Sequence, residues 1–235
     1  MEAAEAPRSG GWSDPRLSGI AHRGFLGRLS HELIEELTRT ARSAYYPKGT
    51  ILGPATDRGP ALVVSGMLRY FLSAGDGRQM TIRYMGPGDL VGSLGNNDAN
   101  LKTHAEVLQP AVLLNLDIRD VRSLAARRPA FAEALLDETV SRVRTAYRTL
   151  SASAFMAVRS RVARDLGERA KISGTPLRPG LHLEVTQQAL ADATGSVREV
   201  VARALRELRE ENVIGPLGDG VTILDFDALD RIGAV

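Results

Sequence analysis

The chain lacks cysteine and has few aromatic residues and few histidines. None of its 235 residues is Cys, 5% are aromatic, and four are His. The absence of cysteine excludes disulfides, zinc ribbons and cysteine-ligated iron–sulfur clusters. The histidines, at positions 22, 31, 104 and 182, show no H-x-x-x-H spacing. We therefore expect no metal site built on histidine.

Long apolar runs are absent as well. No run reaches the roughly 18 residues of a membrane span, and the N-terminus has early acids instead of a signal peptide. Hydrophobic residues still make up 43% of the chain, enough for a buried core of one large or two ordinary domains. These features predict a soluble cytoplasmic protein with no membrane partner.

The charge is distributed unevenly. The whole chain has a net charge of +2, but residues 142–209 contain 13 Lys and Arg against 6 Asp and Glu. This segment has a net charge of +7, which leaves −5 for the rest. Such a basic segment suggests a polyanionic partner, although a solvated helical surface would give the same count.

The first half of the chain predicts an α+β organisation. Residues 1–24 are rich in Ala, Gly, Pro and Ser and predict a flexible arm. Residues 25–44 predict a short helix with Ser30 as its N-cap. From residue 50 to 117, apolar runs alternate with turn signals at 65–66, 75–77 and 86–88. That rhythm is typical of a small antiparallel sandwich or barrel.

Residues 118–172 predict helices that carry an apolar seam. Apolar side chains recur there at alternating spacings of four and three residues, a heptad pattern that favours a partner helix and hence a homodimer. The alternative is that the seam packs against its own sandwich. The seam consists of Leu136, Val140, Val143, Tyr147, Leu150 and Ala154.

A helix-turn-helix is predicted after the linker at 173–180. The first helix begins at N-cap Thr186 and ends at Gly195, a position suited to the left-handed region. The second begins with Ser196 and Glu199, which have the spacing of a capping box. Residues 213–214 and 221–224 then predict a small hairpin, the wing of a winged helix. The set predicts binding to double-stranded DNA.

The second helix divides into two faces. A helical projection places an apolar stripe on one side, which includes Val197, and an arginine-rich face on the other. That second face contains Arg198, Glu199, Ala202, Arg203, Arg206 and Arg209. In the major groove, arginine pairs with guanine and glutamate accepts from cytosine, so this face is suited to reading base edges.

Four stretches, 46–52, 64–71, 85–92 and 195–205, resemble the cyclic AMP receptor protein/fumarate–nitrate regulator (CRP/FNR) family of bacterial transcription factors. The resemblance covers about residues 25–230. It implies a β-roll sensor domain of jelly-roll type at 25–128, a dimerisation helix at 129–157 and a winged helix-turn-helix at 158–235. It also implies that RNA polymerase is a partner.

The resemblance further implies the roles of single residues at the DNA. Arg198, Glu199 and Arg203 match the positions that read GTGA-like half-sites. Phosphate contacts are implied for a second group, which consists of Thr186, Gln187, Gln188 and Ser196.

The candidate effector pocket departs from the family's cyclic-nucleotide site. Ser93 occupies the place of a ribose-binding Glu, and Lys102 stands where a phosphate-binding Arg is expected. Without a bidentate guanidinium, a cyclic phosphate loses its strongest charge-assisted contact. We therefore expect that cyclic AMP is not the effector. The remaining candidate pocket residues are Thr103, His104 and Tyr147.

Other sensors and other functions stay open at this point. Haem could use His104 with a second ligand from the N-terminal arm, a small anion could bind near Lys102, or no ligand could be needed. A sensor module that acts only through protein contacts is a further alternative. An enzyme is not expected, because Val91 breaks the only G-x-S-x-G-like stretch and no phosphate-binding glycine motif is present.

Overall fold

The computed structural model describes residues 15–53, 59–92, 103–173, 175–216 and 219–234. By its internal contacts the chain divides into two compact units. The first contains residues 1–70 and 85–144, and the second contains residues 71–84 and 145–235. None of the helices in the described segments is long and apolar enough to cross a bilayer.

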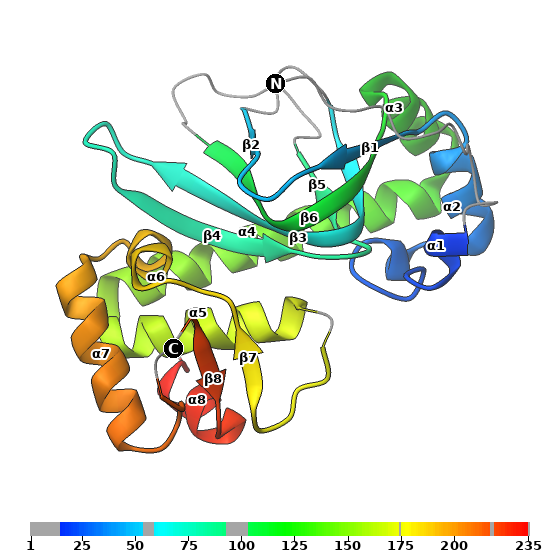
Figure 1. Cartoon of the computed structure of the whole chain (residues 1–235). Helices are drawn as coiled ribbons and strands as arrows, with labels where there is room; N and C mark the ends of the chain where they lie inside the picture. Colours follow the sequence, from blue (N-terminus) through cyan, green and yellow to red (C-terminus); the bar gives the residue numbers. More distant parts are fainter. Residues whose placement is uncertain (1–14, 54–58, 93–102, 174, 217–218, 235) are drawn as a thin grey trace. The chain divides into compact units, whose positions relative to one another are not determined.

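The strands of the first half form one six-stranded sheet in the order β1-β6-β3-β4, with β2 paired to β6 and β5 paired to β3 (Figure 1). The pairs β1–β6, β2–β6 and β3–β5 are antiparallel, as the sequence predicts. The strands are β1 (Arg42–Tyr46), β2 (Ile51–Leu52), β3 (Ala61–Ser73), β4 (Gln79–Met85), β5 (Leu90–Val91) and β6 (Thr103–Asn115).

One predicted turn in this sheet is wrong and another is confirmed. Ser65 and Gly66 do not end a strand, because β3 continues through them. Gly66 has φ +89°, and a Cβ at this position would lie 2.4 Å from the Pro110 carbonyl oxygen, so only glycine fits. At residues 74–78 the hairpin turn is present, and the Ala74 amide donates to the Arg78 carbonyl at 2.8 Å.

The helices of the first unit cover a core that is shared with the sheet. Phe25 and Phe131 meet edge-to-face within this core, with ring centroids 6.2 Å apart. Phe131 also anchors the start of the long helix α4 among buried leucines. The elements are α1 (Pro15–Ser18), η1 (Leu26–Arg28), α2 (His31–Thr38), α3 (Ile118–Arg127) and the first part of α4 (Pro129–Phe155).

Two predictions for the N-terminal region need correction. The predicted flexible arm extends to residue 24, but Leu17 and Ile20 are buried in the core of the first unit. Their apolar side chains are covered by that core, which is why this part of the segment is ordered. The predicted helix at 25–44 is shorter: α2 spans only His31–Thr38, and residues 42–44 belong to β1. Ser30 caps α2 as expected.

The second unit contains the helices and strands of the C-terminal half around its own core. Figure 1 shows α5, α6, α7 and α8 with β7 and β8 in this unit. Buried residues of these elements form its core. The elements are α5 (Val158–Ile172), β7 (Leu181–Leu183), α6 (Gln187–Thr194), α7 (Arg198–Glu210), β8 (Val221–Ile223) and α8 (Phe226–Ile232). Met156 and Ala157 separate α4 from α5, and Ala157 has an extended conformation.

Candidate nucleic-acid interface

The helix-turn-helix predicted at residues 186–214 is present as α6 and α7. Thr186 is the N-cap of α6, and its hydroxyl accepts from the Ala189 amide at 3.1 Å. Gly195 ends α6 with φ +62° and ψ 36°, in the left-handed region that glycine favours. Both signals in the sequence are therefore confirmed, and together they fix the short turn between the two helices.

The predicted capping box at Ser196 is wrong. The N-cap of α7 is Val197, and no side chain caps this helix. The Ser196 amide donates to the Ala191 carbonyl at 3.0 Å, so Ser196 completes the end of α6. One extended residue, Val197, then follows before α7 begins. Because Val197 lies before the first turn of α7, its side chain does not join the buried stripe and is 56% exposed.

The two faces of α7 are otherwise as predicted. Val201, Ala204, Leu205 and Leu208 are buried in the core of the second unit. Arg198, Glu199 and Arg203 are exposed on the other face, followed by exposed Arg206 and Arg209. Within the described residues, neither Arg198 nor Arg203 has an ion-pair partner. Their guanidinium groups are therefore available to an external acceptor.

The acidic groups near the C-terminal end of α7 are partly neutralised. Arg159 of α5 pairs with Glu211, and its Nε lies 3.8 Å from a carboxylate oxygen of Glu207. This pairing occupies carboxylates that would otherwise repel a polyanion. It leaves the exposed arginines as the dominant charges of the outer face.

A groove of about 580 Å³ lies beside the start of α7. Thr186, Gln187, Gln188 and Arg198 line it together with residues 219–221 of the predicted wing. The groove thus brings together three of the four predicted phosphate-contacting residues and one predicted base-reading residue. The Gln188 amide already donates to Asp192 at 2.8 Å, while Ser196 is half-buried outside the groove lining.

The wing contains more strand than the sequence predicts. Ile214 and Ile223 form the expected antiparallel bridge. In addition, β8 pairs along its length with β7, which precedes the helix-turn-helix. Sequence reasoning missed β7 because it has only three residues, Leu181, His182 and Leu183, after a linker that is rich in Pro and Gly.

The structure describes only part of the candidate effector pocket. Ser93 and Lys102 lie outside the described residues. Thr103 and His104 begin β6 in the first unit, and Tyr147 is an exposed residue of α4 in the second unit. Sequence reasoning missed Arg142 of α4, which donates to the carbonyls of Leu90 at 2.6 Å and Gly92 at 2.9 Å. In the described segments, no three His, Asp or Glu side chains gather as metal ligands.

The predicted seam residues are exposed. Leu136, Val140, Val143, Tyr147 and Leu150 have between 40% and 68% of their surface accessible, and Ala154 is exposed as well. Phe155, the last residue of α4, is 85% exposed although the heptad pattern does not include it.

Comparison with known proteins supports this architecture. Residues 44–128 match the cyclic nucleotide-binding domain, and residues 160–232 match the Crp-like helix-turn-helix domain. The chain is 29% identical over 217 residues to a CRP-like cAMP-activated global transcriptional regulator of Mycobacterium tuberculosis. That alignment covers 90% of this chain and 97% of the relative.

Two further matches agree with the first. The chain is 32% identical over 212 residues to the cyclic AMP receptor protein of Thermus thermophilus, an alignment that covers 87% of this chain and 95% of the relative. A crystal structure of a CRP/FNR-family transcriptional regulator from Eubacterium rectale superimposes with a TM-score of 0.70 at 21% identity. This alignment covers 90% of the chain and 98% of that structure, and it shows the shared fold.

The fold and the interface define a transcription regulator that joins a cyclic nucleotide-binding-like domain to a DNA-binding helix-turn-helix. The chain belongs to the CRP/FNR family. Members of this family are transcription regulators and not enzymes, which agrees with the absence of catalytic motifs from the sequence.

Proposed function

We propose that the chain is a homodimeric regulator that reads a pseudo-palindromic, GTGA-like DNA site with α7. The observation that carries this proposal is the exposed Arg198, Glu199 and Arg203 on the outer face of α7, beside the groove. Arginine pairs bidentately with guanine, and glutamate accepts from the cytosine amino group. Thr186, Gln187, Gln188 and Ser196 would hold the phosphates and so fix the position of the helix.

A binding experiment tests the base-reading role. A preferred site is first selected from random double-stranded DNA, and affinities are then measured by fluorescence anisotropy. Arg198→Ala should cost about 1–3 kcal/mol on the selected site and relax the preference at one guanine. The matched control is Arg209→Ala, which removes the same charge from the far end of the same face. We expect the control to weaken selected and random DNA alike.

Two results would contradict the proposal. The first is an equal loss on selected and random DNA for Arg198→Ala, because a base contact must affect the two differently. The second is an affinity that stays flat between low and physiological salt, because neutralising phosphates releases counterions and makes binding salt-dependent.

The exposed seam of α4 supports the proposed homodimer. Two copies that pair through Leu136–Ala154 would place their α7 helices about 34 Å apart, one turn of B-DNA. An effector would then act by shifting the population between two dimer arrangements, with a hinge near Ala157–Arg161 at the start of α5. RNA polymerase is a further proposed partner, on the strength of the family alone.

The effector is proposed to be a ligand other than cyclic AMP, or no ligand. The two relatives described above are named for cyclic AMP, but this chain has Ser93 and Lys102 where Glu and Arg would bind the nucleotide. The candidates for such a ligand are haem, bound at His104, and a small anion, bound near Lys102. Titration calorimetry with cyclic AMP tests the proposal, and binding at micromolar concentration would overturn it.

A further inference from the structure

A buried polar cluster lies in the second unit, away from the DNA-reading face of α7. It consists of Tyr84 on β4 and of Asp165 and Arg169 on α5, none more than 7% exposed. The Tyr84 hydroxyl donates to Asp165 Oδ1, and Arg169 Nε donates to Asp165 Oδ2 at 2.7 Å. The Arg169 guanidinium carbon also lies 4.8 Å from the centre of the Tyr84 ring. Each of the three side chains therefore contacts the other two.

The charges of this cluster depend on one another. Burial, and then the charge of Asp165, raise the pKa of Tyr84, so the phenol keeps its proton and remains a donor. Burial acts to lower the pKa of Arg169, but Asp165 and Tyr84 hold it above its usual value. Removal of any one member leaves a buried polar atom without its partner, which is costly in a dry interior.

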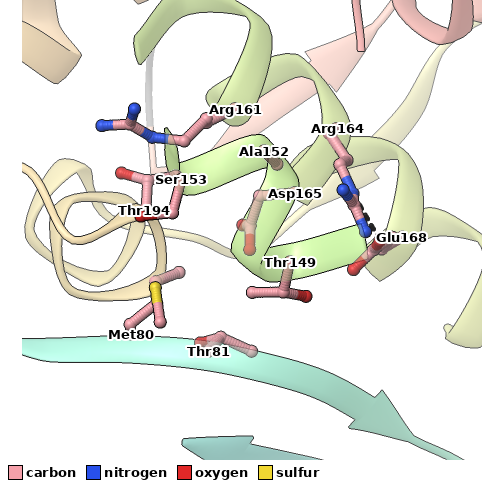
Figure 2. A pocket seen from close by; sticks show the side chains of 11 residues that line it. Met80, Thr81, Thr149, Ala152, Ser153, Arg161, Arg164, Asp165, Glu168 and Thr194 are labelled. Atoms are coloured by element: carbon pink, nitrogen blue, oxygen red, sulfur yellow. Dashed lines mark hydrogen bonds and ion pairs between the residues drawn. The ribbon is translucent and has the colours of Figure 1, made fainter. Parts of the chain in front are cut away.

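Further contacts join the hairpin of β3 and β4, at residues 71–84, to the helices of the second unit. The Thr149 hydroxyl of α4 donates to the Ile82 carbonyl of β4 at 3.1 Å. Figure 2 shows Met80 and Thr81 of β4 opposite Asp165, Thr149 and Thr194, around a small cavity. Its volume is about 40 Å³, space for a water molecule and too little for an organic ligand. Residues 71–84, here called the strap, are therefore attached to α4 and α5 and approach α6.

Helix α5 connects the strap to the DNA-reading helix. Asp165 and Arg169 bind the strap. Arg159, about two to three turns earlier on α5, pairs with Glu207 of α7 and with Glu211, the residue that follows α7. A single rigid helix thus contacts the strap at one set of side chains and α7 at another. With the strap attached, Arg198 and Arg203 remain exposed, so the attached strap leaves the DNA-reading face open.

We propose that Tyr84, Asp165 and Arg169 form a positioning cluster that locks the strap onto α5 and thereby fixes the orientation in which α7 meets DNA. Tyr84 contacts no base or phosphate in this scheme, because it acts through α5. The role in DNA binding rests on the function proposed above, whereas the mechanical role does not. An experiment can therefore separate the two.

The mechanical role is tested with spin labels. Because the chain contains no cysteine, Ala74→Cys in the strap and Glu210→Cys at the end of α7 would be its only two thiols, and both positions are exposed. Labelled chains are mixed with an excess of unlabelled chains, so that a dimer carries at most one labelled chain, and pulsed electron paramagnetic resonance then measures the distance between the two labels of that chain. We expect one narrow distribution for the parent and a clearly broader one after Tyr84→Phe. An unchanged distribution in Tyr84→Phe would overturn the proposal.

Two further variants keep the test decisive. Tyr46→Phe removes the same hydroxyl from a buried tyrosine of β1 in the first unit and should leave the distribution narrow. Arg169→Lys keeps the charge but loses the planar guanidinium, so it should broaden the distribution less than Tyr84→Phe. If Tyr84→Phe does not fold, Arg169→Lys decides, and a parent-like distribution in that variant would overturn the proposal.

The effect on DNA is measured on the same proteins. If only a tenth of the Tyr84→Phe molecules hold α7 in the binding orientation, affinity for the selected site falls about tenfold. Affinity for random DNA should change little, because it depends on charge and not on orientation. A parent protein without preference for any DNA would remove the proposed function. A selective parent whose Tyr84→Phe variant binds the selected site equally well would remove the positioning role alone.

Discussion

Helices α7 and α4 are both amphipathic, but their apolar faces meet different surroundings. In α7, Val201, Leu205 and Leu208 are at most 1% exposed, because the second unit covers them. In α4, Leu136, Tyr147 and Leu150 are at least 60% exposed. An apolar stripe gains stability only when it is covered. The apolar face of α7 is thus covered within one chain while its polar face points outward, whereas the seam of α4 is left exposed, as the proposed homodimer requires.

The largest expected effect comes from the covered stripe. Leu208→Ala removes a fully buried side chain from the core of the second unit and should lower the free energy of unfolding by about 2–5 kcal/mol. Urea denaturation followed by circular dichroism measures this loss. Arg209→Ala, one residue further and exposed, should stay within about 0.5 kcal/mol of the parent. Equal losses in both variants would contradict the assignment of the two faces.

A substitution in the exposed stripe of α4 should change the dissociation constant of the dimer and not the folding of the chain. Leu150→Lys places a charge in the seam twice per two-fold dimer and should weaken the dimer by about 2 kcal/mol or more. Sedimentation equilibrium measures the dissociation constant. Ala146→Lys adds the same charge to an exposed position of α4 outside the seam and should leave it unchanged. A Leu150→Lys protein that dimerises like the parent would mean that the seam is not the interface.

The same contrast explains what the sequence could predict. Thr186, Gly195 and the spacing of apolar residues along α7 act within a few residues, so local rules place both helices and the turn. Ser196 fails as a cap because two local motifs compete for it, and its amide completes α6. The contact between Tyr84 and Asp165 joins residues that are 81 positions apart in the sequence, so no local sequence pattern predicts it. Contacts of this range depend on tertiary packing, which one sequence does not reveal.

Substitutions at the N-caps of α6 and α7 should have a smaller effect on the free energy of unfolding. The Thr186 hydroxyl satisfies the Ala189 amide, so Thr186→Ala should cost about 1 kcal/mol of unfolding free energy. Thr186→Ser keeps the hydroxyl and should recover most of the loss. Val197→Ala, at the cap of α7 that makes no side-chain hydrogen bond, should change the free energy by less. Thermal unfolding of the three variants in parallel checks this order.

The smallest effect is expected at the exposed ion pair between Lys171 of α5 and Asp230 of α8. Lys171 Nζ lies 3.0 Å from an Asp230 oxygen, but both side chains are more than half exposed. Water and salt screen such a pair, so Lys171→Ala should cost less than about 1 kcal/mol, and added salt should reduce the loss further. Arg169, two residues earlier on the same helix, has a buried partner in Asp165, and salt should hardly affect the destabilisation caused by its removal. Chemical denaturation with urea at low and high sodium chloride measures both. A Lys171→Ala loss as large and as salt-independent as that of Arg169→Ala would show that burial does not set the strength of these pairs.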